Sequence, residues 1–167
     1  GCFCGGRQGV KRILTLWAAL GVVYVALEVI FRGYSHPSMF VVGGLCGLLV
    51  GAINQCPKFY HAPVFLQSII GALIVLCVEF VSGCILNLWL GLGVWDYSGM
   101  AGNLLGQVCP AFGLLWFLIM PLAIWAEDTG NWLIWFYEIN ANNRQTAPPD
   151  FAMYSLKSVY TDFITGK

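Results

Sequence analysis

Charge is what this sequence has least of. Only 10% of its 167 residues are Asp, Glu, Lys or Arg, and the formal net charge is zero. Soluble domains carry about 25% charged residues, and a nucleic-acid-binding surface needs a basic excess that is missing here. Apolar residues make up 59% of the chain. This composition predicts a one-domain, polytopic membrane protein whose main partner is the lipid bilayer, with no nucleic-acid partner.

The sequence also lacks the common signatures of catalysis and of metal or nucleotide binding. It contains no Walker A, GxGxxG, HExxH or GxSxG motif. Its seven cysteines are odd in number and do not follow zinc-ligand spacing. We therefore predict no catalytic residues, no metal site and no cofactor, and a protein that is not an enzyme.

Long apolar runs, in contrast, are abundant, and four of them predict membrane spans. A hydrocarbon core of about 30 Å requires roughly 20 helical residues. The predicted spans are residues 12–31, the shorter 39–54, the longer 64–90, and 104–126, which contains Pro110 and Pro121. The expected fold is an all-α integral membrane protein with a four-helix transmembrane bundle at residues 12–126, preceded by a short terminus at 1–11.

Basic residues set the expected orientation, because Lys and Arg favour the cytoplasmic side of a membrane. With four spans, only Arg32 falls on the outer side. The other seven fall on the side of the two termini: Arg7, Lys11, Arg12, Lys58, Arg144, Lys157 and Lys167. We therefore expect both termini to be cytoplasmic.

Residues 127–167 are predicted to form an interfacial and cytoplasmic tail. Aromatic residues at 131–137 suit the membrane–water boundary and predict a short interfacial helix. Residues 150–164 have apolar residues at helical spacing and predict a C-terminal amphipathic helix. Its apolar stripe needs a partner, which is the protein's own cytoplasmic face, the membrane or another subunit.

Glycines line one face of the second predicted span. Gly43, Gly47 and Gly51 form a GxxxGxxxG ridge that lets another helix approach closely. Two interpretations remain open: packing within the chain, or an interface for a homodimer or for a subunit of a membrane complex.

Polar residues inside apolar runs are the candidate binding site. Helix rise places Glu28, Glu79 and Gln107 at similar depths, about 22–25 Å from the cytoplasmic boundary, so they are expected to meet in the outer half of the bundle. The complete set of candidate ligands is Glu28, Arg32, Glu79, Asn87, Asp96, Asn103 and Gln107.

A carboxylate in lipid costs about 2.5–3.5 kcal/mol on insertion scales, so Glu79 needs a reason to be there. It pairs with Arg32, carries a proton, or meets a cation or a hydrogen-bonding ligand. The cluster is then either a polar network that fixes helix register or a binding site. Asp96 is either the rim of that site or the acceptor in a local turn.

The chain resembles the CmpB-like ABC-transporter type IV family of small bacterial membrane proteins. The resemblance covers about residues 12–126 and rests on three stretches: LEVIFRG, EFVSG followed by NLWLGLGVWDYS, and NLLGQVCPAFGLLW. It implies a multi-pass protein of the bacterial plasma membrane with a role in transport.

Two functions follow as hypotheses. The first is a transport or channel-like protein whose outer-half polar cavity binds a small cation or polar solute. The second is a non-catalytic structural or accessory subunit that dimerises or docks a partner through its glycine ridge and C-terminal helix.

Overall fold

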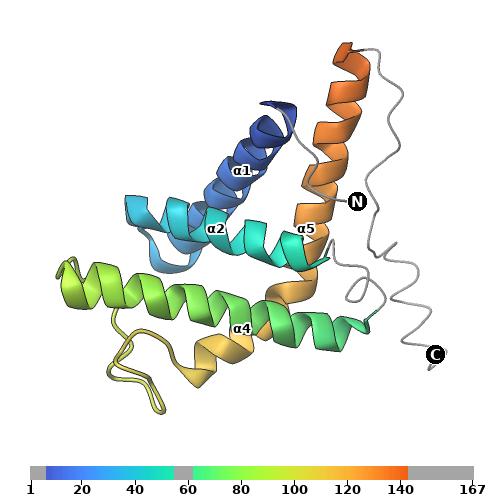
Figure 1. Cartoon of the computed structure of the whole chain (residues 1–167). Coiled ribbons are helices and arrows are strands. Elements are labelled where there is room, and N and C mark those ends of the chain that lie inside the picture. The colour runs from blue at the N-terminus through green and yellow to red at the C-terminus, as the bar shows by residue number, and fades with distance from the viewer. Residues whose placement is uncertain (1–6, 55–61, 143–167) are drawn as a thin grey trace.

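The computed structural model describes residues 7–54 and 62–142. It contains α1 (Arg7–Arg32), α2 (Pro37–Asn54), α4 (Val64–Gly83), the π-helix η1 (Cys84–Trp89) and α5 (Pro110–Asn142) (Figure 1). Within these residues all regular elements are helices, residues 90–109 form a loop, and the β pairing is an isolated bridge between Leu104 and Val108.

Three helical segments are long and apolar enough to cross a membrane. They are Val10–Ile30, Val64–Trp89 and Pro110–Ile134, and the shorter apolar segment Pro37–Ala52 accompanies them. The expectation of an all-helical membrane protein is thus confirmed. Whether α2 forms a fourth crossing, and which side the termini face, stay predictions.

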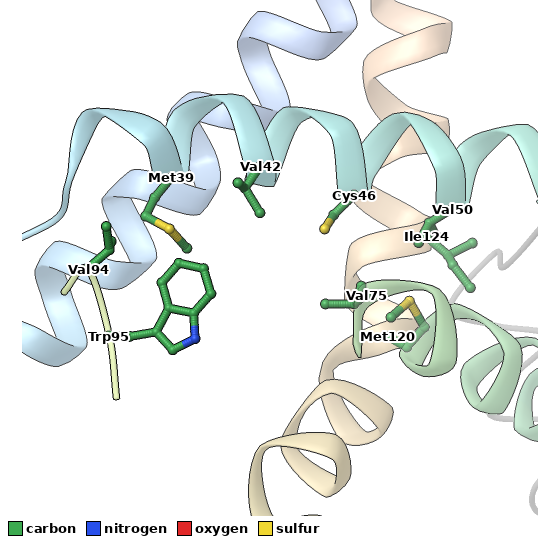
Figure 2. Packing of buried hydrophobic residues seen from close by; sticks show 9 residues of the cluster. All are labelled: Met39, Val42, Cys46, Val50, Val75, Val94, Trp95, Met120 and Ile124. Atoms are coloured by element: carbon green, nitrogen blue, oxygen red, sulfur yellow. The ribbon is translucent and has the colours of Figure 1, made fainter. Parts of the chain in front are cut away.

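The helices are not all aligned. Figure 1 shows α2 and α4 side by side, with α1 and the C-terminal half of α5 at a steep angle to them. The buried apolar core lies where α2, α4 and α5 meet. Figure 2 shows Met39 and Trp95 at one end of this core, and Val50, Met120 and Ile124 at the other.

Glycine makes the close approach of α4 and α5 possible. Met120 of α5 is only 1% exposed. A Cβ atom on Gly71 of α4 would lie 2.5 Å from the Met120 sulfur. Bare backbone at Gly71 therefore admits the largest fully buried side chain of the described residues.

The glycine ridge of α2 is covered by the chain's own helices. Gly43 lies against Tyr24 of α1, Gly47 against Leu20 of α1, and Gly51 against Glu127 of α5. None of the three has space for a Cβ atom. The structure thus supports packing within the chain, and the ridge is not available to a second copy in this arrangement.

The fourth span begins later than expected. Residues 104–109 are not helical, and α5 starts at Pro110. Leu105 and Gly106 both have positive φ, of 52° and 69°, which an α-helix does not allow. Asn103 and Gln107 are therefore loop residues, and the expected start of the fourth span at residue 104 was wrong.

The same helix also continues further than expected. α5 runs unbroken from Pro110 to Asn142 and has Pro121 in its interior. The predicted end at residue 126 and the separate interfacial helix at 131–137 were therefore wrong. Glu127 and Asp128, the first residues of the predicted tail, are buried side chains in mid-helix. The predicted helix at 150–164 lies outside the described residues.

Candidate functional site

Glu79 is the centre of a polar site built by three helices. Its side chain is 4% exposed, on α4. The Tyr24 hydroxyl of α1 donates a hydrogen bond to Glu79 Oε1 over 3.3 Å, and Trp116 Nε1 of α5 donates to the same oxygen over 3.1 Å. The Tyr24 and Trp116 rings stack on each other with centroids 5.7 Å apart. The carboxyl group is therefore held in one orientation from two sides.

The other carboxylate oxygen of Glu79 is different. Glu79 Oε2 is buried and has no hydrogen-bond partner. Leaving a buried acceptor unpaired costs about 1–3 kcal/mol, and more for a charged group. An oxygen of this kind is unusual in a native interior and calls for an explanation, such as a ligand that it receives.

Glu28 lies close to this site. Its carboxyl group is near enough to Glu79 for the two charges to interact. The Ser35 hydroxyl donates to Glu28 Oε2 over 2.6 Å. The side chain of Arg32 is not among those that the structure describes, so its expected pairing with either carboxylate stays a prediction.

Gln107 belongs to a separate amide cluster. Asn87 Nδ2 donates to Gln107 Oε1 over 2.8 Å and to the Trp95 carbonyl over 3.0 Å. Asn87 Oδ1 accepts from Val94 N over 2.7 Å, and Trp95 Nε1 donates to the Gln107 carbonyl over 2.9 Å. The expected convergence of Glu28, Glu79 and Gln107 therefore holds only in part, because Gln107 hydrogen-bonds with Asn87 and Trp95 instead.

Gly83 separates the two clusters on α4. A Cβ atom there would lie 2.5 Å from Gln107 Oε1 and 3.0 Å from the Trp95 ring. The amide cluster thus packs against bare helix backbone one turn beyond Glu79. Asn87 itself lies on the π-helix η1. A π-helix is rare and is frequently found at functional sites.

Asp96 and Asn103 serve the loop that carries Gln107. Asp96 accepts from Ser98 N at 2.8 Å and from the Ser98 hydroxyl at 2.9 Å. Asn103 donates to the Ser98 and Met100 carbonyls and accepts from Gly106 N. These contacts match the local-turn interpretation of Asp96. The ligand role of both residues stays a prediction.

A second buried polar cluster was missed by the sequence analysis. Glu127, Asp128 and Asn131 of α5 are 3%, 7% and 6% exposed. Arg12 of α1 donates to Asn131 Oδ1 from Nε over 3.1 Å and from Nη2 over 2.9 Å. The signal was present as acidic and amide side chains four residues apart, in a run that stays apolar and aromatic beyond them. The predicted span ended at residue 126, so the acidic pair was placed in the tail.

The comparisons with known proteins give one family. The profile of the family described as "Putative ABC-transporter type IV" matches residues 15–144, which include Tyr24, Glu79 and Trp116 of the Glu79 site. No curated protein matches the chain, and no solved structure matches it.

Proposed function

The chain belongs to this ABC-transporter type IV family, and from that premise we propose that it is a membrane-embedded, non-catalytic component of a transport system. In this proposal Glu79 binds a small cation or a polar solute as it passes. The expected location is the bacterial plasma membrane.

The observation that carries the proposal is the buried, unpartnered Oε2 of Glu79. The carboxyl group is oriented through its other oxygen by Tyr24 and Trp116, so no rearrangement is needed before a ligand arrives. Pre-organised groups bind with a smaller entropic cost than mobile ones.

The surroundings favour a cation over a neutral solute. Glu28 lies near enough for its charge to interact with that of Glu79. Two neighbouring carboxyl groups in an apolar interior gain most from a ligand that brings positive charge. A small inorganic or ammonium cation is therefore the first class to test.

The test is uptake into proteoliposomes. Radiolabelled rubidium and methylammonium serve as probes, and the variants are Glu79→Gln and Asp96→Asn. Asp96 is an exposed loop residue whose carboxyl bonds within its own turn, so Asp96→Asn makes the same acid-to-amide change away from the buried site. We expect Glu79→Gln to reduce uptake at least about tenfold, as expected for the loss of roughly 1.4 kcal/mol of binding.

Unchanged uptake by a Glu79→Gln protein of normal stability would contradict the proposal. Equal losses in both variants would show that total charge matters and that the Glu79 site does not.

The second candidate is an accessory subunit that docks a partner. It is supported by the lack of a Walker A motif in a chain whose family is named for ABC transporters. A partner would then bind a surface other than the glycine ridge, which α1 and α5 cover. This candidate predicts that a Glu79→Gln protein assembles normally. A strict monomer in detergent, with no co-purifying protein, counts against it.

A further inference from the structure

The loop at residues 90–109 folds back along α4 before α5 begins. A Cβ atom on Gly113, in the first turn of α5, would lie 3.2 Å from Leu76 Cδ1 of α4. Leu76 lies roughly 20 Å of helix before Trp89, where the apolar segment formed by α4 and η1 ends. A hydrocarbon core is about 30 Å thick. Because this segment is apolar enough to cross a membrane, the end of the loop lies beside it at the depth of the hydrocarbon core.

A hollow of about 220 Å³ lies where the loop returns to α4. Leu104 and Pro110 are exposed, so the hollow reaches the molecular surface. An uncharged lining gives an ion no compensation for its lost hydration, whereas it suits a hydrocarbon chain. The lining consists of apolar side chains and one glycine: Leu76, Gly102, Leu104, Val108, Cys109 and Pro110.

Two adjacent leucines beside the hollow are directed outward. Leu104 is 54% exposed and Leu105 is 62% exposed. Leu105 also has φ of 52°, a left-handed conformation that leucine rarely adopts. Neighbouring large apolar side chains on a surface mark a contact with lipid or with another protein. The loop therefore presents an apolar surface at the mouth of the hollow.

The backbone of this turn is suited to an apolar environment. An irregular segment can lie at membrane depth only if its backbone polar groups are bonded within the protein. The N–H groups of Leu104, Gly106 and Gln107 each donate a hydrogen bond within the loop. Within the same loop, hydrogen bonds are accepted by the carbonyls of Leu104, Leu105, Gly106 and Val108.

The loop has little to select a lipid headgroup. Asp96 is the one charged residue between positions 90 and 109. Its carboxylate accepts two hydrogen bonds from Ser98 in its own turn. Binding would therefore depend on the acyl chain, which is the apolar group that surrounds a spanning helix at this depth.

We propose that one acyl chain of a membrane lipid occupies the hollow between Leu76 of α4 and residues 102–110, and that residues 90–109 form a re-entrant segment. The site shares no residue with the Glu79 site, and the proposal does not depend on a role in transport.

The test is photolabelling of the full-length chain in proteoliposomes. The probe is a phosphatidylcholine that carries a diazirine near the end of one acyl chain, and labelled residues are located by mass spectrometry. We expect labelling to concentrate on residues 102–110 and on the part of α4 around Leu76. A phosphatidylglycerol with the same modified chain should label these residues to the same extent.

Val108→Phe adds a phenyl ring to the lining of the hollow. Displacing about two methylene groups of the bound chain should reduce labelling by about tenfold. Val81→Phe is the matched control, because Val81 is a 57% exposed residue of α4 that does not line the hollow. The control should be labelled as the wild type is. If Val108→Phe fails to fold, Leu104→Trp makes the corresponding test at an exposed position.

Four results would overturn the proposal. Labelling spread evenly over the exposed residues of α4 would indicate ordinary surrounding lipid, and undiminished labelling of a folded Val108→Phe or Leu104→Trp protein would show that the hollow is not occupied. Labelling by phosphatidylglycerol alone would show that the headgroup determines binding. Labelling that occurs in proteoliposomes but not in native membranes would show that a protein partner covers the hollow.

Discussion

The polar sites at Glu79 of α4 and Asn87 of η1 differ in how completely their side chains are hydrogen-bonded. At Asn87, the side-chain oxygen and amide are both engaged, and the bonds close a network with Gln107 and Trp95. At Glu79, two donors meet one oxygen and the other oxygen has none. Only bare backbone at Gly83 separates the two sites.

This difference separates a structural role from a binding role. A fully satisfied buried network rigidifies the fold, because removing any member leaves other groups unpaired. A half-satisfied carboxyl group adds little to stability and keeps an acceptor for a ligand. Stability measurements should therefore rank the two sites in the opposite order from binding measurements.

The largest loss of stability is expected for Asn87→Ala. The change removes the three hydrogen bonds that Asn87 makes with Val94 N, the Trp95 carbonyl and Gln107 Oε1. At roughly 1 kcal/mol for each lost bond, the free energy of unfolding should fall by about 3 kcal/mol. Ser82→Ala is the control, since the Ser82 hydroxyl bonds only to carbonyls of its own helix. Equal effects from both would show that the amide network is not structural.

A smaller loss is expected for Gly106→Ala, in the loop that delivers Gln107 to the network. Gly106 has φ of 69°, and a Cβ atom there would lie 2.8 Å from Asp96 Oδ1. The strain should cost about 2 kcal/mol, measured by thermal unfolding in detergent. Gly99→Ala is matched to it, because a Cβ atom at Gly99 meets nothing within 4 Å. If the two variants have the same melting temperature, the loop is less constrained than we infer.

Trp116→Phe tests the donor side of the Glu79 site. It removes the 3.1 Å hydrogen bond and keeps an aromatic ring to stack on Tyr24. We expect a loss of about 1 kcal/mol in unfolding free energy and weaker uptake of the cation probes, since Glu79 is then oriented by Tyr24 alone. Normal uptake by Trp116→Phe would show that the Trp116 hydrogen bond is not needed for cation binding at Glu79.

Glu79→Gln should change stability least, by less than about 0.5 kcal/mol, because glutamine can still accept the two existing hydrogen bonds. Its effect on uptake should be the largest of the four. If Glu79→Gln unfolds the protein and Asn87→Ala does not, the contrast between the two sites is wrong.

The sequence predicted the helices well, because long apolar runs leave few alternatives in a membrane. Glu79, which interrupts the apolar run of α4, is buried, whereas Glu28 of α1 is only half-buried. The depth calculation predicted Glu28 and Glu79 at one level, and the two carboxyl groups are near enough to influence each other electrostatically.

Gln107 was misplaced for a physical reason. Depth counted along a helix fails when residues 102–106 turn through three positive φ values, at Gly102, Leu105 and Gly106. Of these, Leu105 gives no sign in the sequence, because leucine rarely adopts this conformation. The tertiary contacts of Gln107 with Asn87 and Trp95 hold the loop in place, and they cannot be read from local pattern.

The buried cluster of Glu127, Asp128 and Asn131 was missed because an acidic pair after an apolar run normally marks the end of a membrane span. Its burial depends on Gly51, which lies far away in the sequence, and on the Arg12–Asn131 contact. Both are long-range facts. A single sequence does not show which distant residues come into contact in the folded chain.

Pro121 gives α5 a mechanical property that its length conceals. Proline has no N–H group, so the carbonyl of Phe117 lacks the donor that a helix would normally supply, and the ring crowds it. The helix is therefore easier to bend at Pro121 than elsewhere along its length. Trp116, which contacts Glu79, lies before Pro121, and Glu127 lies after it. A bend at Pro121 would therefore move the Glu79 site relative to the Glu127 cluster.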